Sequence, residues 1–519
     1  MPLTHLLPRF FLLLLLSFGS LLALADAQPL ARLAPHQFVE STPEAEGIPS
    51  SAIRKLVDSL NKHPDSIHSF VLLRHGKKVA EAWWAPYRRQ DVHQLWSVSK
   101  SFTSAAIGFA VAEKRLSIYD PVIKFFPDDL PAQPSEHLKN LRIKDLLTMS
   151  TGQEKDAFEA MFMATEPSLV RIFFAQPIEH KPGTLFVYNS GATYMLSAII
   201  QKVTGQKLVD YLTPRLFEPL GIKQHPWEQS RDGITYGGFG LYLTTEDIAR
   251  FGQLYLNQGV WNGQQLLPAD WVAMSSAKQV SNGSNPEGFW DQGYGFQFWR
   301  NVGYGYRADG AFGQFCFVLP EFDLVLAVTS GSPDMRIILD NVWRALIPQL
   351  RSDALASAAA DHARLRKQLS QLALPVAKGK RSSPVAKSWS GKQIVFEANE
   401  LGITSARIEF GSASTRVTFM RGDIPAKLEA GYQYWMDSVF AFDEYFNPNK
   451  FAVTNNIASS AAWATKDHFV VKVVCRHTHH TLTLNFRFSG DNVIFDGERN
   501  LDFGERKLPV LKGRLVPVR

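Results

Sequence analysis

The spacing of hydrophobic positions changes several times along the chain, and each change predicts an element. Apolar residues recur at helical intervals over residues 50–62, which predicts a helix. Two apolar runs on either side of the turn His75-Gly76-Lys77-Lys78 predict a hairpin of two strands, residues 67–74 and 79–84. Helical spacing then returns and, with glycine and proline near the ends, predicts four helices at residues 97–112, 192–203, 208–216 and 245–256.

Short apolar runs separated by glycines begin near residue 293. They are rich in aromatic residues and valine, and they predict successive antiparallel strands at residues 294–299, 304–308, 313–319 and 324–329. A last helix is predicted to start with Ser332 as N-cap and Pro333 at its first position, and to run to Leu350. Because strands at both ends enclose a helical middle, residues 28–350 are predicted to form one α+β domain with an antiparallel sheet flanked by helices.

A second unit is predicted beyond residue 350. Residues 351–390 are predicted to hold a polar helix, residues 354–374, followed by a basic linker with proline and serine, residues 375–390. In residues 391–519, apolar and polar positions alternate, which predicts an all-β domain of sandwich or barrel-like form. The clearest strands are predicted at residues 406–410, 416–419, 469–475 and 481–488.

The N-terminal residues 1–27 resemble a secretory signal in composition. Arg9 precedes a leucine-rich run, and Ala25-Asp26-Ala27 supplies a small-residue cleavage site before Gln28. A membrane anchor is the alternative, but serine and glycine interrupt the run, and no later stretch is apolar for long enough to span a bilayer. We therefore expect an exported protein, periplasmic or secreted, with no integral membrane span after cleavage.

Charge and cysteine content narrow the classes of partner. The chain of 519 residues carries 55 Lys and Arg against 49 Asp and Glu, a balance that does not indicate a nucleic-acid partner. Cys316 and Cys475 fall in different predicted domains, so no disulfide framework is expected, and whether the two pair is left open. His477, His479 and His480 cluster beside Cys475, but we predict an exposed turn between two strands there and no metal site. No cofactor is expected.

A serine and a lysine at the start of one predicted helix are candidate catalytic residues. Ser97 lies three residues before Lys100, which places hydroxyl and ammonium on one face of the helix N-terminus. A partly buried Lys100 would lose its proton and help activate the serine hydroxyl, which is otherwise a poor nucleophile. Two other S-x-x-K pairs occur, at residues 59–62 and 275–278, and an N-cap serine beside a solvated lysine explains this stretch equally well.

Two further stretches add candidate chemistry. Tyr188 ends an apolar run directly before a predicted helix, where a phenol could exchange protons with a hydroxyl, although a core tyrosine is the commoner case. Glycines in residues 305–320 would let a substrate carbonyl approach the backbone, and an N–H there could form an oxyanion hole with that of Ser97. A glycine-rich sheet edge is the alternative. The chain lacks a G-x-S-x-G elbow, which argues against an α/β-hydrolase.

Five motifs, in order, resemble the serine β-lactamase and D-alanyl-D-alanine carboxypeptidase superfamily, and most of all its class C-like branch of esterases, D-amino peptidases and amide hydrolases. The motifs are SVSK (97–100), IKDLLTMSTGQ (143–153), FVYNSG (186–191), GGFGLYLTTEDIARFGQLYLNQG (237–259) and ADGAFGQ (308–314). The resemblance covers residues 48–350 and implies a helical subdomain beside the antiparallel sheet. It implies that Ser97 is the acylated nucleophile, Lys100 its base partner and Tyr188 the third member, with the N–H groups of Ser97 and Ala311 as the oxyanion hole. Which of Lys100 and Tyr188 takes the first proton is left open, and the two are treated as one unit.

The chain departs from the family pattern at two positions. Ser190 stands where the family has an asparagine, and the family's K-T-G strand motif is replaced by ADG, residues 308–310. If Asp309 points into the cleft, it would repel a carboxylate and attract an amine, so we expect poor β-lactam turnover and a neutral or amine-bearing substrate. The alternative is that Asp309 pairs with Arg307 or Lys100. The expected substrate-binding residues are Ser190, Asp309 and Gly310.

These observations predict an exported serine hydrolase that cleaves an ester or amide of a small molecule or peptide through a Ser97 acyl-enzyme. Two alternatives stay open: a catalytically silent protein that binds cell-wall or peptide ligands, and a penicillin-interacting D-Ala peptidase.

Overall fold

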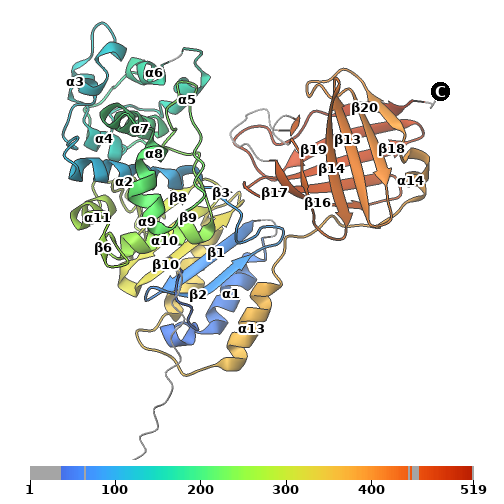
Figure 1. Ribbon diagram of the computed structural model, residues 1–519, viewed down its shortest axis with the longest axis horizontal. Coiled ribbons are helices and arrows are strands. Elements are labelled where there is room, and N and C mark those ends of the chain that lie inside the picture. Colours follow the sequence, from blue (N-terminus) through green and yellow to red (C-terminus); the bar gives the residue numbers. More distant parts are fainter. Residues whose placement is uncertain (1–36, 64–65, 167, 442–444, 447–454, 517–519) are drawn as a thin grey trace, which may run out of the picture. The chain divides into compact units, whose positions relative to one another are not determined.

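A computed structural model of the chain describes residues 37–63, 66–166, 168–441, 445–446 and 455–516 (Figure 1). The predicted signal segment, residues 1–27, lies outside the described residues. Within those ranges, no helix combines the length and the apolar character that a membrane crossing requires.

Strands from both ends of the first 350 residues form one antiparallel sheet. Within the described residues it has six strands in the order β2-β1-β10-β9-β8-β7, and β1 pairs along its length with β10. The strands are β1 (Ile67–Arg74), β2 (Lys77–Trp83), β7 (Trp299–Arg300), β8 (Tyr306–Gly310), β9 (Gln314–Leu319) and β10 (Leu324–Ser330). The predicted α+β class and the hairpin are confirmed.

Alternate residues of each central strand enter different hydrophobic cores, because successive side chains of a strand point to opposite faces. Val71 and Leu73 of β1 face a core with α2 (Ser99–Ala112) and α10 (Thr245–Leu256). Phe70 and Leu72 face a second core. That core includes residues of α1 (Ser50–Leu60), α12 (Arg336–Asn341) and α13 (Ala359–Ser370). Figure 1 shows the helices of the two cores on the two sides of the sheet.

A helical subdomain shares the core of α2. It contains α3 (Glu136–Asn140), α4 (Ile143–Leu147), α5 (Phe158–Met163), α6 (Leu169–Ala175), α7 (Ser190–Thr204) and α8 (Leu208–Leu212), followed by a π turn (Thr213–Phe217) and α9 (Glu218–Leu220). The helix α11 (Ala269–Ser276) follows α10. The helices predicted at residues 97–112, 192–203 and 245–256 are confirmed, while the one predicted at 208–216 stops being α-helical at residue 212.

Two elements predicted after residue 293, a strand at residues 294–299 and the last helix of the α+β domain, are wrong in their bounds. Residues 294–299 do not extend as a strand, because Tyr294 bridges both Val280 and Trp299 and the segment folds back on itself through a hydrogen bond from Gly295 N to Phe298 O of 2.8 Å. The last helix begins at Arg336 and not at Pro333, since the Ser332 hydroxyl donates to Asp334 O in place of capping a helix. It is α-helical only to Asn341, and a π turn (Val342–Leu346) and a 3-10 turn (Ile347–Gln349) follow it in place of the α-helix predicted to Leu350.

The C-terminal sheet closes into a barrel. It runs in the order β14-β13-β12-β11-β20-β19-β18-β17-β16-β15, and a short parallel pairing of β14 with β16 closes a ring of nine of the described strands. Its strands are β11 (Gln393–Phe396), β12 (Ser405–Phe410), β13 (Ser414–Arg421), β14 (Ile424–Tyr432), β15 (Met436–Val439), β16 (Asn456–Trp463), β17 (His468–Cys475), β18 (Thr481–Ser489), β19 (Asn492–Arg499) and β20 (Leu511–Leu515). The predicted all-β domain is therefore confirmed in its barrel form. Closure leaves few exposed strand edges.

The segment between sheet and barrel is partly helical. The predicted polar helix, residues 354–374, is observed as the shorter α13. Within the predicted linker, α14 (Pro384–Trp389) places Trp389 in the barrel core with 2% of its surface exposed. The domain boundaries at residues 350 and 390 stay predictions.

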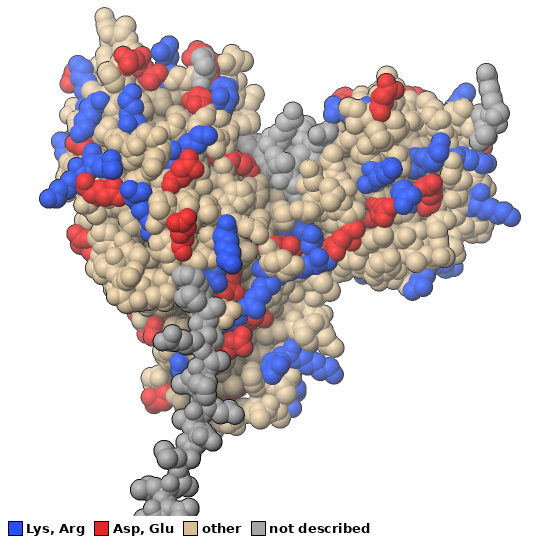
Figure 2. Space-filling view, viewed as in Figure 1, with Lys and Arg blue, Asp and Glu red and all other residues tan. Residues whose placement is uncertain are grey.

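Charged and cysteine residues follow the composition. On the face seen in Figure 2, Lys and Arg intermix with Asp and Glu, so neither sign forms a continuous patch there. Cys316 and Cys475 are buried free thiols. They belong to different cores, that of α2 and that of the barrel.

The three clustered histidines lie, as predicted, in the turn between β17 and β18. The prediction that this turn is exposed is wrong. His479 and His480 expose only 1% and 7% of their surface, because the turn packs against residues that precede α2. One of these contacts is a hydrogen bond between His479 and Trp96, the residue directly before Ser97.

Candidate active site

Ser97 and Lys100 meet at the start of α2. Ser97 lies in a 3-10 turn, η2 (Trp96–Val98), that leads directly into this helix, and Lys100 is in the first turn of α2. The Lys100 Nζ to Ser97 Oγ distance is 3.1 Å. The pairing predicted from S-x-x-K spacing is thus a direct contact between the two side chains.

Lys100 is an almost fully buried amine, with 1% of its surface exposed. Its Nζ lies 2.8 Å from Gly238 O and 3.2 Å from Ser190 Oγ, both of which can accept hydrogen bonds from it. Burial lowers the pKa of Lys100 from its ordinary value to about 7, against the opposing field of Asp156. A large fraction of the amine is therefore free of its proton at neutral pH.

Tyr188 lies beside both Ser97 and Lys100. Its ring centroid is 5.0 Å from Lys100 Nζ, and the ring stacks on Trp299 at 5.5 Å between centroids. Burial raises the pKa of Tyr188 above its ordinary value, and a hydrogen bond with Ser97 opposes this rise. Tyr188 is accordingly a neutral phenol at working pH, in hydrogen-bond contact with the candidate nucleophile.

The departure at residue 190 has a clear structural result. Asn189 turns away from the site: its side chain accepts from Ala192 N at 3.1 Å as the N-cap of α7 and donates to Gln153 at 2.7 Å. Ser190 takes the position beside Lys100. A hydroxyl therefore stands where the family's amide would be expected.

Ala311 and Gly310 bring the end of the sheet against the nucleophile's turn. Ala311 follows β8 and lines the same cavity as Ser97. A Cβ on Gly310 would lie 2.3 Å from Leu95 O and 3.2 Å from Val98 N, so only glycine lets β8 approach this closely. The oxyanion hole of Ser97 and Ala311 stays a prediction.

Asp309 lines the cavity, but its charge is paired with that of Arg307. Its Oδ2 accepts from Arg307 Nε at 3.0 Å and from Trp290 Nε1 at 2.9 Å. Arg307 is fully buried, with 0% exposed, so this ion pair is needed to hold the guanidinium in the interior. Of the alternatives for Asp309, the structure shows pairing with Arg307.

One cavity joins these residues. It has a volume of about 520 Å³ and is lined by Trp96, Ser97, Asp156, Phe158, Glu159, Phe162, Met163, Tyr188, Ser190, Phe239, Trp290, Trp299, Asp309, Ala311, Met335 and Phe503. Most of this wall is aromatic or aliphatic, and Asp156 and Glu159 add two carboxylates that the sequence analysis missed. Their segment, residues 154–163, carries no recognisable motif.

Comparison with known proteins agrees with this geometry. A family model described as Beta-lactamase matches residues 66–337, just over half of the chain. The chain belongs to the Beta-lactamase family. Its relatives place this Beta-lactamase family member among β-lactamase-fold serine hydrolases.

The Beta-lactamase family relatives are distant. The 6-aminohexanoate-dimer hydrolase of Paenarthrobacter ureafaciens is 25% identical over 299 residues, or 51% of this chain and 73% of the relative. A protein of Escherichia coli (strain K12) provisionally named a D-alanyl-D-alanine carboxypeptidase is 22% identical over 307 residues, 45% of this chain and 71% of its own. A Bacillus anthracis structure provisionally named a 6-aminohexanoate-dimer hydrolase aligns with a TM-score of 0.50 at 21% identity, over 59% of this chain and 86% of that one, and shows the same fold.

Proposed function

We propose that the protein is a serine hydrolase that cleaves an ester or amide through an acyl-enzyme on Ser97. The observation that carries this proposal is the 3.1 Å contact between Ser97 Oγ and the buried Lys100 Nζ, whose pKa burial lowers to about 7. A serine hydroxyl needs an adjacent base to act as a nucleophile, and this lysine is positioned to be that base.

The proposed reaction uses the side chains of Lys100, Tyr188 and Ser190 and two backbone N–H groups around Ser97. Free Lys100 takes the Ser97 proton while Oγ bonds to the substrate carbonyl carbon, and the N–H groups of Ser97 and Ala311 stabilise the oxyanion. Tyr188, which hydrogen-bonds to Ser97, passes a proton to the leaving oxygen or nitrogen as the carbonyl re-forms. Lys100 then passes the proton it took from Ser97 to Tyr188. Water attacks the acyl-enzyme and loses a proton to the same pair, which returns a proton to Ser97 Oγ as the acid is released. Ser190 holds Lys100 in place throughout.

The cavity favours a neutral or amine-bearing substrate with apolar groups. Its wall is largely aromatic, and Asp156 and Glu159 supply negative charge that would repel the carboxylate of a β-lactam or of a C-terminal D-alanine. The segment ADG supplies neither the lysine nor the hydroxyl of the family's strand motif. The relative named for hydrolysis of a 6-aminohexanoate dimer, an amide with a terminal amine and a terminal carboxylate, supports an amide as the substrate. We therefore propose that the protein hydrolyses β-lactams poorly.

We also propose that the protein works outside the cytoplasm, periplasmic or secreted. The support for this proposal is the signal-like composition of residues 1–27.

The test is hydrolysis of p-nitrophenyl esters and of an amine-bearing amide by the wild type and by Ser97→Ala, with a chromogenic cephalosporin and a D-Ala-D-Ala peptide in parallel. The proposal expects turnover of the first two substrates that Ser97→Ala abolishes, and little of the others. Efficient D-Ala-D-Ala cleavage would favour the peptidase alternative. Equal, negligible turnover by both proteins would contradict the proposal and favour a binding protein.

A further inference from the structure

Trp96, the residue before the proposed nucleophile, has an unusual backbone. Its φ is +49°, in the left-handed region that bulky side chains seldom enter. Such a conformation persists only where the surroundings hold it, and at active sites it often serves to aim the next residue. What holds Trp96 therefore bears on how Ser97 is aimed.

Two residues of the barrel contact Trp96 and help to stabilise its backbone conformation. Trp96 Nε1 donates a hydrogen bond to His479 Nδ1 at 3.0 Å, and the two rings lie 5.4 Å apart between centroids. Phe503, in the loop after β19, contacts the same indole at 5.1 Å. His479 lies 383 residues from Trp96 along the chain and Phe503 lies still farther away, so neither contact follows from local sequence.

The turn that carries His479 is anchored to the segment before α2 by several bonds. Gln94 N donates to His477 O at 2.8 Å, and the Tyr87 hydroxyl donates to Thr478 O at 2.9 Å. Arg476 pairs with Asp91 at 3.3 Å, and both side chains are largely buried. These bonds make the turn an ordered part of the surroundings of Trp96.

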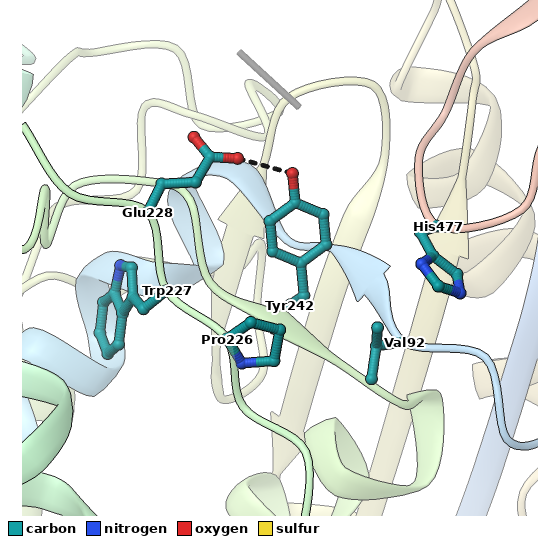
Figure 3. Close-up of a pocket in the computed structure, with 6 residues that line it drawn as sticks. All are labelled: Val92, Pro226, Trp227, Glu228, Tyr242 and His477. Atoms are coloured by element: carbon teal, nitrogen blue, oxygen red, sulfur yellow. Dashed lines mark hydrogen bonds between the residues drawn. The ribbon is translucent and has the colours of Figure 1, made fainter. Parts of the chain in front are cut away.

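His477 extends this contact to a small second cavity. It lines a space of about 210 Å³ together with residues on either side of the short β3 (His93–Gln94) and β4 (Tyr242–Leu243) pairing. Figure 3 shows His477 across from Val92 and Tyr242, with the Tyr242 hydroxyl donating to Glu228. The turn thus contacts the catalytic half at several residues between Tyr87 and Trp96.

His479 is suited to accept from the indole. Burial lowers its pKa well below the ordinary histidine value, so the ring is neutral and Nδ1 keeps a free lone pair. The ring of neighbouring His480 lies 3.9 Å from that of His479 between centroids, and its charged neighbours are Asp502 and Arg499. The two adjacent histidines therefore offer a matched pair for comparison.

Phe503 reaches the substrate cavity itself. It lines the cavity of Ser97, and its ring lies 4.8 Å from Phe312, the residue after Ala311. The side chain is 70% exposed, so most of its surface is open to a ligand in the cavity. An apolar group of a substrate in the cavity would cover this ring.

We propose that the barrel completes the active site: His479 is a positioning residue that holds Trp96, and through it Ser97, while Phe503 is a specificity-determining wall for apolar substrate groups. This inference rests on the proposed serine hydrolase function and deepens it. It explains why a catalytic sheet and a barrel are joined in one chain with the barrel's turn packed beside the nucleophile.

The first test compares His479→Ala, His479→Asn and His480→Ala in p-nitrophenyl butyrate hydrolysis. An asparagine Oδ1 can accept from the indole near the position of Nδ1, so His479→Asn should keep most of the wild-type kcat. We expect His479→Ala to lower kcat at least tenfold with KM within twofold, and His480→Ala to stay within threefold. Equal losses in His479→Ala and His480→Ala, or none in His479→Ala, would overturn the positioning role.

The second test uses Phe503→Ala, an exposed change that should not impair folding, with Ile424→Ala as the control because Ile424 is 63% exposed on the barrel. We expect Phe503→Ala to raise KM at least fivefold for p-nitrophenyl octanoate and less than twofold for the acetate, and Ile424→Ala to change neither. Unchanged octanoate kinetics would refute the wall. If the wild type shows no turnover that depends on Ser97, the proposed function fails and this inference fails with it. If the wild type is active but His479→Ala and Phe503→Ala have wild-type kinetics, the inference alone fails.

Discussion

The pH dependence of turnover should report the protonation of Lys100. Its amine is 1% exposed and contacts Ser97 Oγ, Ser190 Oγ and Gly238 O, none of which carries a charge. Burial lowers the pKa of Lys100 to about 7. Because the base must be free of its proton, kcat/KM should rise as pH increases through this value and then level off.

The size of the effect follows from the titration. Below the pKa, the fraction of free amine falls about tenfold per pH unit, so kcat/KM at pH 5 should be about one hundredth of the plateau. Burial raises the pKa of Tyr188 above its ordinary value, so its phenol should cause no loss of activity up to about pH 10. The profile should therefore have a rising limb near pH 7 and a broad plateau.

A single variant gives the direction of the test. The field of Asp156 raises the pKa of Lys100, so Asp156→Asn should lower that pKa and move the rising limb to lower pH. Glu159→Gln is the matched control, since Glu159 lines the same cavity and should leave the limb in place. The assay is kcat/KM for a neutral p-nitrophenyl ester from pH 5 to pH 9. A flat profile, or a limb that moves to higher pH in Asp156→Asn, would refute the role of Lys100 as base.

Three further substitutions test the frame of the site. Gly310→Ala should lower kcat/KM about a hundredfold with the fold retained by circular dichroism, because the new Cβ would lie 2.3 Å from Leu95 O and displace the nucleophile's turn; near wild-type kinetics would contradict this. Asp309→Asn leaves the guanidinium of Arg307, 0% exposed, without its counter-charge, so urea unfolding should show a loss of about 3–5 kcal/mol, and an unchanged midpoint would show that the pair is dispensable. Ser190→Ala removes one partner of the lysine amine and should reduce kcat about tenfold in the same ester assay, whereas an increase would argue against its supporting role.

Local patterns were enough to predict the elements that build the site. The period of apolar residues predicted the helix of residues 97–112 and the hairpin of residues 67–84, because both elements are formed by residues that are close together in the sequence. The spacing of Ser97 and Lys100 on one helix predicted their contact for the same reason. What periodicity could not supply was the choice among three S-x-x-K pairs, which depended on resemblance to a family.

The contacts that were missed all depend on which way a side chain points or on distant parts of the chain. The sequence could not show that Asp309 turns to Arg307, because a strand register does not fix a rotamer. The burial of His479 depends on packing of the barrel turn beside Trp96, and such long-range packing leaves no mark in local hydrophobicity. Asp156 lies in a segment without a motif, and only its place in the cavity reveals it.

The most direct test of the central claim is the mass of the acyl-enzyme. The wild type would be mixed with a p-nitrophenyl ester, quenched in acid within the first turnover and digested, and the peptides measured by mass spectrometry. The account predicts one acyl group per molecule on the peptide that contains Ser97, and none in Ser97→Ala treated in the same way. Turnover without an adduct at Ser97, or with the adduct on another residue, would contradict it.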